Sequence, residues 1–76
     1  MTGLKRALHP MPNKIRAELE KRGLTAAYEV RPAYQRNDYL GWIAQAKREE
    51  TKDKRLAQML DELERGGVYM NMIWRG

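Results

Sequence analysis

The feature that most constrains the fold of this 76-residue sequence is a helical stripe near its C-terminal end. The apolar residues of the stripe fall at i, i+3, i+4 and i+7: Leu56, Met59, Leu60 and Leu63. Acidic residues at positions 49, 50 and 53 suit the start of a helix dipole, and Arg65 suits its end. Gly66 and Gly67 then stop the helix. We therefore predict a helix over about residues 49–65, with one face on a core.

Two shorter helices are predicted near the N-terminus. The first covers residues 12–22, because Pro12 fits an opening position, Ile15 and Leu19 are spaced at i and i+4, and Gly23 follows. The second covers residues 24–30, a two-turn segment that ends before Pro32.

A further helix is predicted over residues 32–47, with Asn37 as the alternative, later N-cap. Its apolar stripe again follows helical spacing, at Tyr39, Trp42, Ile43 and Ala46. A chain without Phe needs large apolar groups inside, so we expect Tyr39 and Trp42 to belong to the core. Gly41 interrupts this helix at a cost of roughly 1 kcal/mol. Either this glycine lies on the exposed face of the helix, or another part of the backbone passes close to it; we expect the close approach.

The fold class predicted is all-α, a small bundle of three to four helices with an extended C-terminal tail packed on it. The tail alternates apolar residues like a strand (Val68, Met70, Met72 and Trp74), but a single strand has no partner. We expect it to cover the helices; the rival is an exposed edge that pairs with a second copy or a partner strand. Residues 1–11 are expected to form a flexible arm, and residues 12–76 a single domain.

Missing residue types exclude several kinds of site. The chain has no Cys and no Ser, and its one histidine is His9. The usual nucleophile–base pairs and His/Cys metal clusters are therefore not available, so we expect no catalytic residue, no cofactor and no metal. No apolar run approaches the ~20 residues of a membrane span, and we find no signal-peptide pattern. We expect a cytoplasmic protein.

The charge is basic, with 15 Lys and Arg against 10 Asp and Glu and a net charge of +5. The excess lies in residues 1–55. Such a surface could attract an anionic partner, but the interspersed acidic residues equally fit an ordinary solvated surface.

The segment "YQRNDYLGWIAQAKREETKDKRLAQMLDEL" resembles the YdeI/OmpD-associated family, also called the bacteriocin-protection domain. The residues that carry the likeness are Arg36, Asp38, Tyr39, Trp42, Ile43, Ala46, Lys47, Glu50, Thr51 and Arg55. The likeness extends more weakly over about residues 11–74, including the ending "GGVYMNM". The resemblance implies a small helical domain with a part in stress or antimicrobial-peptide resistance, and it supplies no catalytic residues.

The leading hypothesis is a non-catalytic binding module, whose partner is an unknown protein or an anionic molecule, in a monomer or weak homodimer. Its candidate partner-binding residues are Arg36, Asp38, Lys47, Thr51, Lys52 and Arg55. A structural role is the competing interpretation, with Thr51 capping a helix and Lys47 or Arg55 pairing with nearby acids.

The alternative function is nucleic-acid binding by the helix pair of residues 34–55. The second helix of the pair would present Lys52, Lys54, Arg55 and Gln58. Glu49 and Glu50 at its start disfavour this alternative, because the N-terminal end of such a helix usually meets bases and phosphates.

Overall fold

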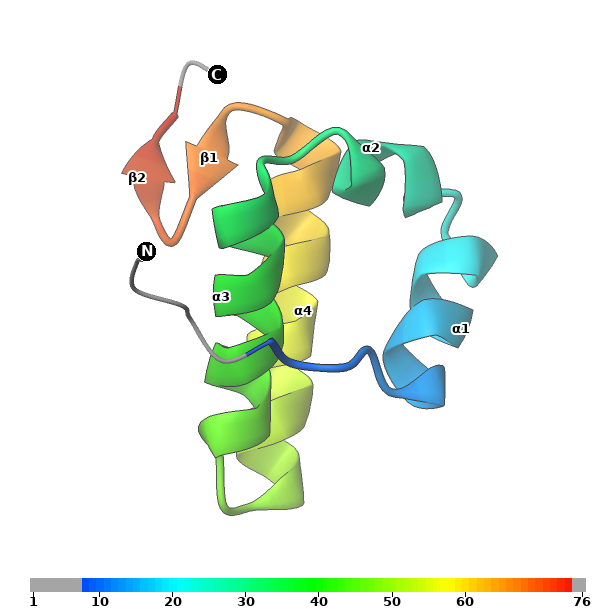
Figure 1. The fold of residues 1–76 in the computed structure, drawn as a ribbon, viewed down its shortest axis with the longest axis vertical. Coiled ribbons are helices and arrows are strands. Elements are labelled where there is room, and N and C mark those ends of the chain that lie inside the picture. The colour runs from blue at the N-terminus through cyan, green and yellow to red at the C-terminus, as the bar shows by residue number, and fades with distance from the viewer. Residues whose placement is uncertain (1–7, 75–76) are drawn as a thin grey trace, which may run out of the picture.

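The computed structural model describes residues 8–74, which form four helices and one short hairpin. The helices are α1 (Asn13–Lys21), α2 (Thr25–Glu29), α3 (Ala33–Gln45) and α4 (Glu49–Arg65), and the strands are β1 (Val68–Tyr69) and β2 (Met72–Ile73). Figure 1 shows α3 and α4 as an antiparallel pair, with α1 beside it and α2 and the hairpin near one end. The prediction of four helices is confirmed. The all-α class is confirmed only in the main, because a two-stranded sheet is also present.

The end of α1 turns the chain into α2 through a glycine. Gly23 has φ +68, a left-handed conformation that favours glycine. Its N–H donates to the Glu20 carbonyl at 3.2 Å, and the Leu24 N–H donates to the Leu19 carbonyl at 2.8 Å. These two bonds form a Schellman motif, with Leu24 and Leu19 both in the core. The predicted stop at Gly23 is confirmed.

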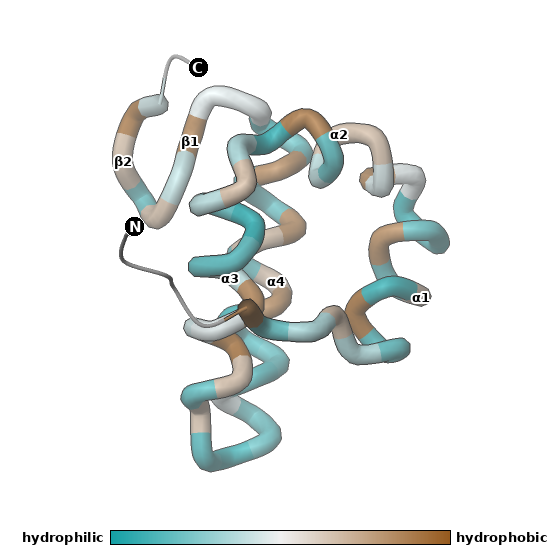
Figure 2. The backbone as a smooth tube through the Cα atoms, in the orientation of Figure 1, coloured by the Kyte–Doolittle hydropathy of each residue, from teal (hydrophilic) through white to brown (hydrophobic). Residues whose placement is uncertain are grey.

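The core is built from one face of each helix. Its buried apolar members are Ile15, Leu19, Leu24, Tyr28, Tyr39, Leu40, Ile43, Leu56, Met59, Leu60 and Leu63. Figure 2 shows apolar residues recurring between hydrophilic ones along α1 and α4. The stripes predicted for these two helices therefore face the core. Among residues 8–74, no helix is long and apolar enough to cross a membrane.

The C-terminal tail supplies its own strand partner, which corrects the prediction of a single extended segment. β1 and β2 pair antiparallel, with Val68 opposite Ile73 and Tyr69 opposite Met72. The two turn residues, Met70 and Asn71, have φ of 51° and 65°. Two successive positive φ values match the right-handed twist of a tight hairpin. The expected packing on the helices is present only in part, since Tyr69 and Met70 pack against the core while Met72 and Ile73 of β2 are exposed.

The segment before α1 lies across α3, as the blue trace in Figure 1 shows. The His9 N–H donates to Asn37 Oδ1 at 2.8 Å, and Met11 packs against the core. Residues 1–7 of the expected flexible arm lie outside the described residues.

Gly41 is buried in α3, and the group close to it is a side chain. A Cβ placed on Gly41 would lie 2.6 Å from His9 Nε2. The expected close approach is therefore present, but the imidazole of His9 makes it and not a second backbone.

Gly41→Ala gives a test of this contact in two backgrounds. Alanine favours the helix by up to about 1 kcal/mol over glycine, but in the native chain the His9 ring must first move away. We expect Gly41→Ala to stabilise a His9→Ala background more than it stabilises the native chain. Chemical denaturation of the native chain, the two single variants and the double variant measures the free energy of unfolding of each. Equal effects of Gly41→Ala in both backgrounds would show that the contact with His9 does not affect stability.

Candidate functional site

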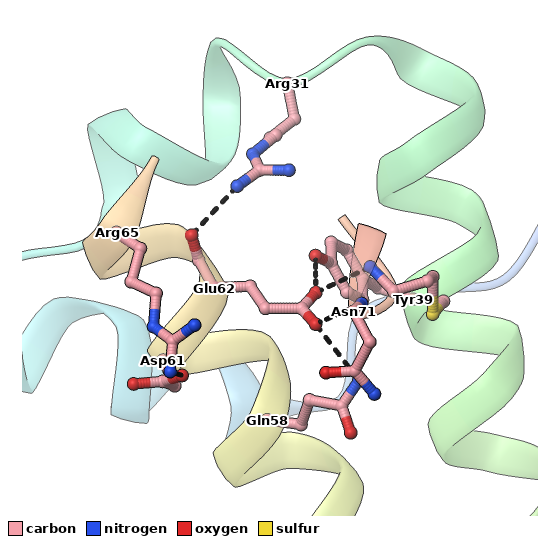
Figure 3. A network of polar contacts seen from close by, with 8 residues as sticks. Arg31, Tyr39, Gln58, Asp61, Glu62, Arg65 and Asn71 are labelled. Carbon is pink, nitrogen blue, oxygen red and sulfur yellow. Dashed lines mark hydrogen bonds and ion pairs between the residues drawn. The ribbon is translucent and has the colours of Figure 1, made fainter. Parts of the chain in front are cut away.

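The buried carboxylate of Glu62, on α4, holds the hairpin in place. The side chain is 1% exposed, and each of its oxygens accepts two hydrogen bonds. Oε1 accepts from the Tyr39 hydroxyl and from the Met70 N–H at 2.8 Å. Oε2 accepts from Gln58 Nε2 at 3.0 Å and from the Asn71 N–H at 2.8 Å. Figure 3 shows these donors converging on the carboxylate from α3, α4 and the turn.

These contacts shift two pKa values in opposite directions. Burial raises the pKa of the Glu62 carboxyl and is the largest single effect, but the four hydrogen bonds together outweigh it and leave this pKa below its ordinary value. Burial, followed by the bond to Glu62, raises the pKa of the Tyr39 hydroxyl. Glu62 is therefore an anion and Tyr39 a neutral donor at pH 7.

A second buried polar group, Arg31, ties the end of α2 to α4. Its Nη2 donates to the backbone carbonyl of Glu62 at 3.0 Å, and its Nη1 donates to Gln35 Oε1 at 3.1 Å. Its guanidinium also lies 4.6 Å from the ring centre of Trp74, just after β2. The tail is thus held at both its turn and its end.

A pocket of about 290 Å³ lies where the segment before α1, α3 and the hairpin meet. The described residues that line it are His9, Asn37, Asp38, Gly41, Trp42, Gln45, Tyr69 and Met70. Five of these lie on one face of α3, at positions 37, 38, 41, 42 and 45. The hairpin completes the wall, and the Tyr69 hydroxyl donates to Asp38 Oδ2 at 2.8 Å.

Trp42 lies between the core and this pocket, so its prediction as a core residue is only partly correct. Its side chain packs against the core but is half-buried, whereas Tyr39 is completely buried as predicted. The Arg55 guanidinium lies 5.2 Å from the Trp42 ring centre, and its Nη1 donates to the Trp42 carbonyl at 2.6 Å. Arg55 thereby links α4 to α3.

The six predicted partner-binding residues do not form one site. Asp38 lines the pocket and Arg55 supports it through Trp42, while the Arg36 guanidinium lies 3.7 Å from Glu29. Lys52 lines a separate pocket of about 150 Å³ beside Ile43 and Leu56.

Lys47 and Thr51 lie near the start of α4. Lys47 is exposed in the loop between α3 and α4, and Thr51 is half-buried inside α4. The N-cap of α4 is Arg48, with no side-chain cap, so the interpretation of Thr51 as a cap is wrong.

The helix pair of the nucleic-acid alternative is present, but its chemistry does not favour nucleic acid. Arg55 is engaged with Trp42, and Glu49 and Glu50 occupy the first turn of α4. A phosphate approaching that end would meet two carboxylates.

Several site residues were not identified from the sequence, namely His9, Asn37, Gln45, Glu62, Tyr69 and Met70. The spacing of Asn37, Gly41 and Gln45 at i, i+4 and i+8 is a signal for the face of α3 that lines the pocket. Within residues 8–74, no group of three or more His, Cys, Asp or Glu side chains could hold a metal ion. The described lining of the pocket supplies one carboxylate, two amides, an imidazole and aromatic rings.

Comparisons with known proteins give one match. The family model described as "Bacteriocin-protection, YdeI or OmpD-Associated" matches residues 9–66. The matched span contains all of α1 to α4 and most of the residues that line the pocket, and it stops before the hairpin. No curated protein and no solved structure matches the chain.

Replacing Glu62 tests the anchor and its dependence on pH. Glu62→Gln should lower the free energy of unfolding by about 2–3 kcal/mol at pH 7, because the amide presents a donor to groups that are themselves donors. Since the folded pKa of Glu62 is lowered, its stabilisation is present above the ordinary value of 4.5 and is lost as pH falls through the folded pKa. The difference in free energy of unfolding between the native chain and Glu62→Gln should therefore become smaller below about pH 4.5.

The matched control is Glu64→Gln, at an exposed glutamate on the same helix. Urea denaturation from pH 7 to pH 3 measures the free energy of unfolding of all three chains. The loss of unfolding free energy caused by Glu62→Gln is compared with the loss caused by Glu64→Gln. A loss for Glu62→Gln that stays constant over this pH range, or that equals the loss for the control, would contradict the role of the ionised carboxylate.

Proposed function

The chain belongs to the bacteriocin-protection family of YdeI or OmpD-associated proteins, and from this membership we propose that it is a non-catalytic binding domain that protects bacteria against antimicrobial peptides. The observation that carries the proposal is the family match over residues 9–66, which spans the whole helical scaffold.

The chemistry of the described residues supports a binding role. Glu62 is the buried carboxylate, and its oxygens are already engaged by four donors, two of them backbone N–H groups of the turn. It is therefore suited to hold the fold together. The pocket beside α3 offers a carboxylate, amides, an imidazole and a tryptophan at its surface, groups that can hydrogen-bond to a partner or stack on it.

We place this binding domain in the bacterial cytoplasm. The chain has no Cys, which is compatible with a reducing compartment.

A survival assay tests the protective role. Bacteria that lack the chain should be more sensitive to a bacteriocin than the same strain complemented with it, measured as the minimum inhibitory concentration. Leu63→Asp, which puts a charge into the core, gives an unfolded control and should fail to complement. Equal sensitivity of the complemented and uncomplemented strains would refute the protective role.

The non-catalytic part of the proposal needs its own measurement. The purified chain is incubated with the bacteriocin, and the peptide is recovered and weighed by mass spectrometry. We expect an unchanged mass. A cleaved or modified peptide would show that the chain is an enzyme.

A further inference from the structure

The outer strand of the hairpin, β2, has an unpaired edge. Among residues 8–74 the sheet consists of β1 and β2, so β2 is paired along one edge and open along the other. β1 packs on α4, and Figure 1 shows β2 on the side of the hairpin that faces away from α4. An open strand edge is a ready site for pairing with another chain.

The register of the hairpin determines which backbone groups this edge presents. The Trp74 N–H donates to the Gly67 carbonyl at 2.9 Å, so these two residues form a hydrogen-bonded pair of the sheet. Hydrogen-bonded pairs alternate with non-bonded pairs along two antiparallel strands, and the next pair is Val68 opposite Ile73. The N–H and C=O of Ile73 therefore point away from β1, toward the open edge.

The side chains of β2 are apolar and lie in water. Ile73 is 81% exposed and Met72 is 61% exposed, although both are large enough to be useful in a core. Adjoining apolar side chains on a surface are typical of an interaction site. Proteins that stay monomeric commonly protect a strand edge with Lys or Pro, and β2 contains neither.

The hairpin also lacks charge. Residues 66–74 (GGVYMNMIW) contain no Lys, Arg, Asp or Glu, in a chain of which 33% of the residues are charged. Two copies that each carry a net charge of +5 repel one another. Contact through an uncharged segment is opposed least by this repulsion. The distribution of charge therefore favours the hairpin for contact between two basic copies.

We infer that β2 is a self-association edge, on which β2 of a second copy pairs antiparallel about a twofold axis through Ile73. In this register the Ile73 residues of the two copies exchange both N–H···O=C hydrogen bonds, and Met72 lies opposite Trp74 of the second copy. The two hairpins then form one four-stranded sheet. A two-stranded hairpin has little stability of its own, and the added strands supply more. The inference goes beyond the proposed function and does not rest on it.

A second copy suits this edge better than a strand of another protein. β2 is two residues long, and Ile73 is the one whose backbone groups face outward, so an added strand gains two backbone hydrogen bonds there. A second copy also brings its own exposed Met72 and Ile73, and a twofold contact uses each of them twice. Because the contact is small, we expect a weak dimer with a Kd on the order of 0.1–1 mM.

Nuclear magnetic resonance of a mixed sample tests the pairing with the native chain. Equal amounts of isotope-labelled and unlabelled full chain are combined at about 1 mM, where a dimer of the expected Kd is well populated. We expect a nuclear Overhauser contact between the Met72 Hα of one copy and the Trp74 Hα of the other, because these residues form a closely spaced non-bonded pair. The Ile73 amide shift should also depend on concentration. No association at this concentration, or association through residues outside β2, would overturn the inference.

Ile73→Lys tests the edge with a substitution. It places two like charges opposite each other on the twofold axis, and it should weaken association at least about tenfold. Because this side chain is exposed, the fold should be retained, which far-ultraviolet circular dichroism checks.

The matched control is Ala17→Lys, which adds the same charge at an exposed position of α1. Figure 1 places α1 and the hairpin on opposite sides of the α3–α4 pair. The control should associate nearly as strongly as the native chain. Equal effects of the two substitutions would show that net charge and not the edge governs association, which would overturn the inference.

Salt separates this contact from an ionic one. Screening lowers the repulsion between two copies of the same net charge, so association should strengthen as salt rises from about 20 mM to about 300 mM. Sedimentation equilibrium measures the Kd across this range. Association that weakens with added salt would indicate ion pairs between copies at another surface and would overturn the inference.

Discussion

The C-terminal half of the structure depends on the four hydrogen bonds that the buried carboxylate of Glu62 accepts. A buried anion is stable only when its acceptor positions are filled. Two of the four donors here are the N–H groups of Met70 and Asn71, which a tight turn would otherwise leave without protein partners. The hairpin therefore satisfies the charge on α4, and that charge in turn holds two non-glycine residues at positive φ. We expect neither the buried Glu62 carboxylate nor the hairpin to be stable in this arrangement without the other.

This anchor also determines the shape of the candidate site. The hairpin places Tyr69 beside α3, where its hydroxyl orients Asp38 and its ring packs against Tyr39. Tyr39 donates in turn to Glu62, so the anchor and the pocket share one chain of contacts. On the same face of α3, Gly41 leaves room for the His9 ring. The pocket beside α3 is thus completed by segments from both ends of the described chain.

Much of the helical scaffold could be predicted from the sequence because its signals are local. The stripe at Leu56, Met59, Leu60 and Leu63 and the stop at Gly23 each depend on residues a few positions apart. The hairpin and the pocket could not be predicted in the same way. Glu62 looks like any surface charge beside that stripe, and its burial arises only when Tyr39 and the turn come together across long sequence separations. Propensity also disfavours Met70 at positive φ, and a tertiary contact overrides it.

Native-state amide hydrogen exchange at the hairpin turn tests the central claim most directly. The account predicts that the Met70 and Asn71 amides exchange slowly in the native chain, and that Glu62→Gln speeds their exchange much more than that of the Ile43 amide inside α3. If both turn amides of the native chain exchange at the rate of an unstructured peptide, the Glu62 carboxylate does not hold the hairpin.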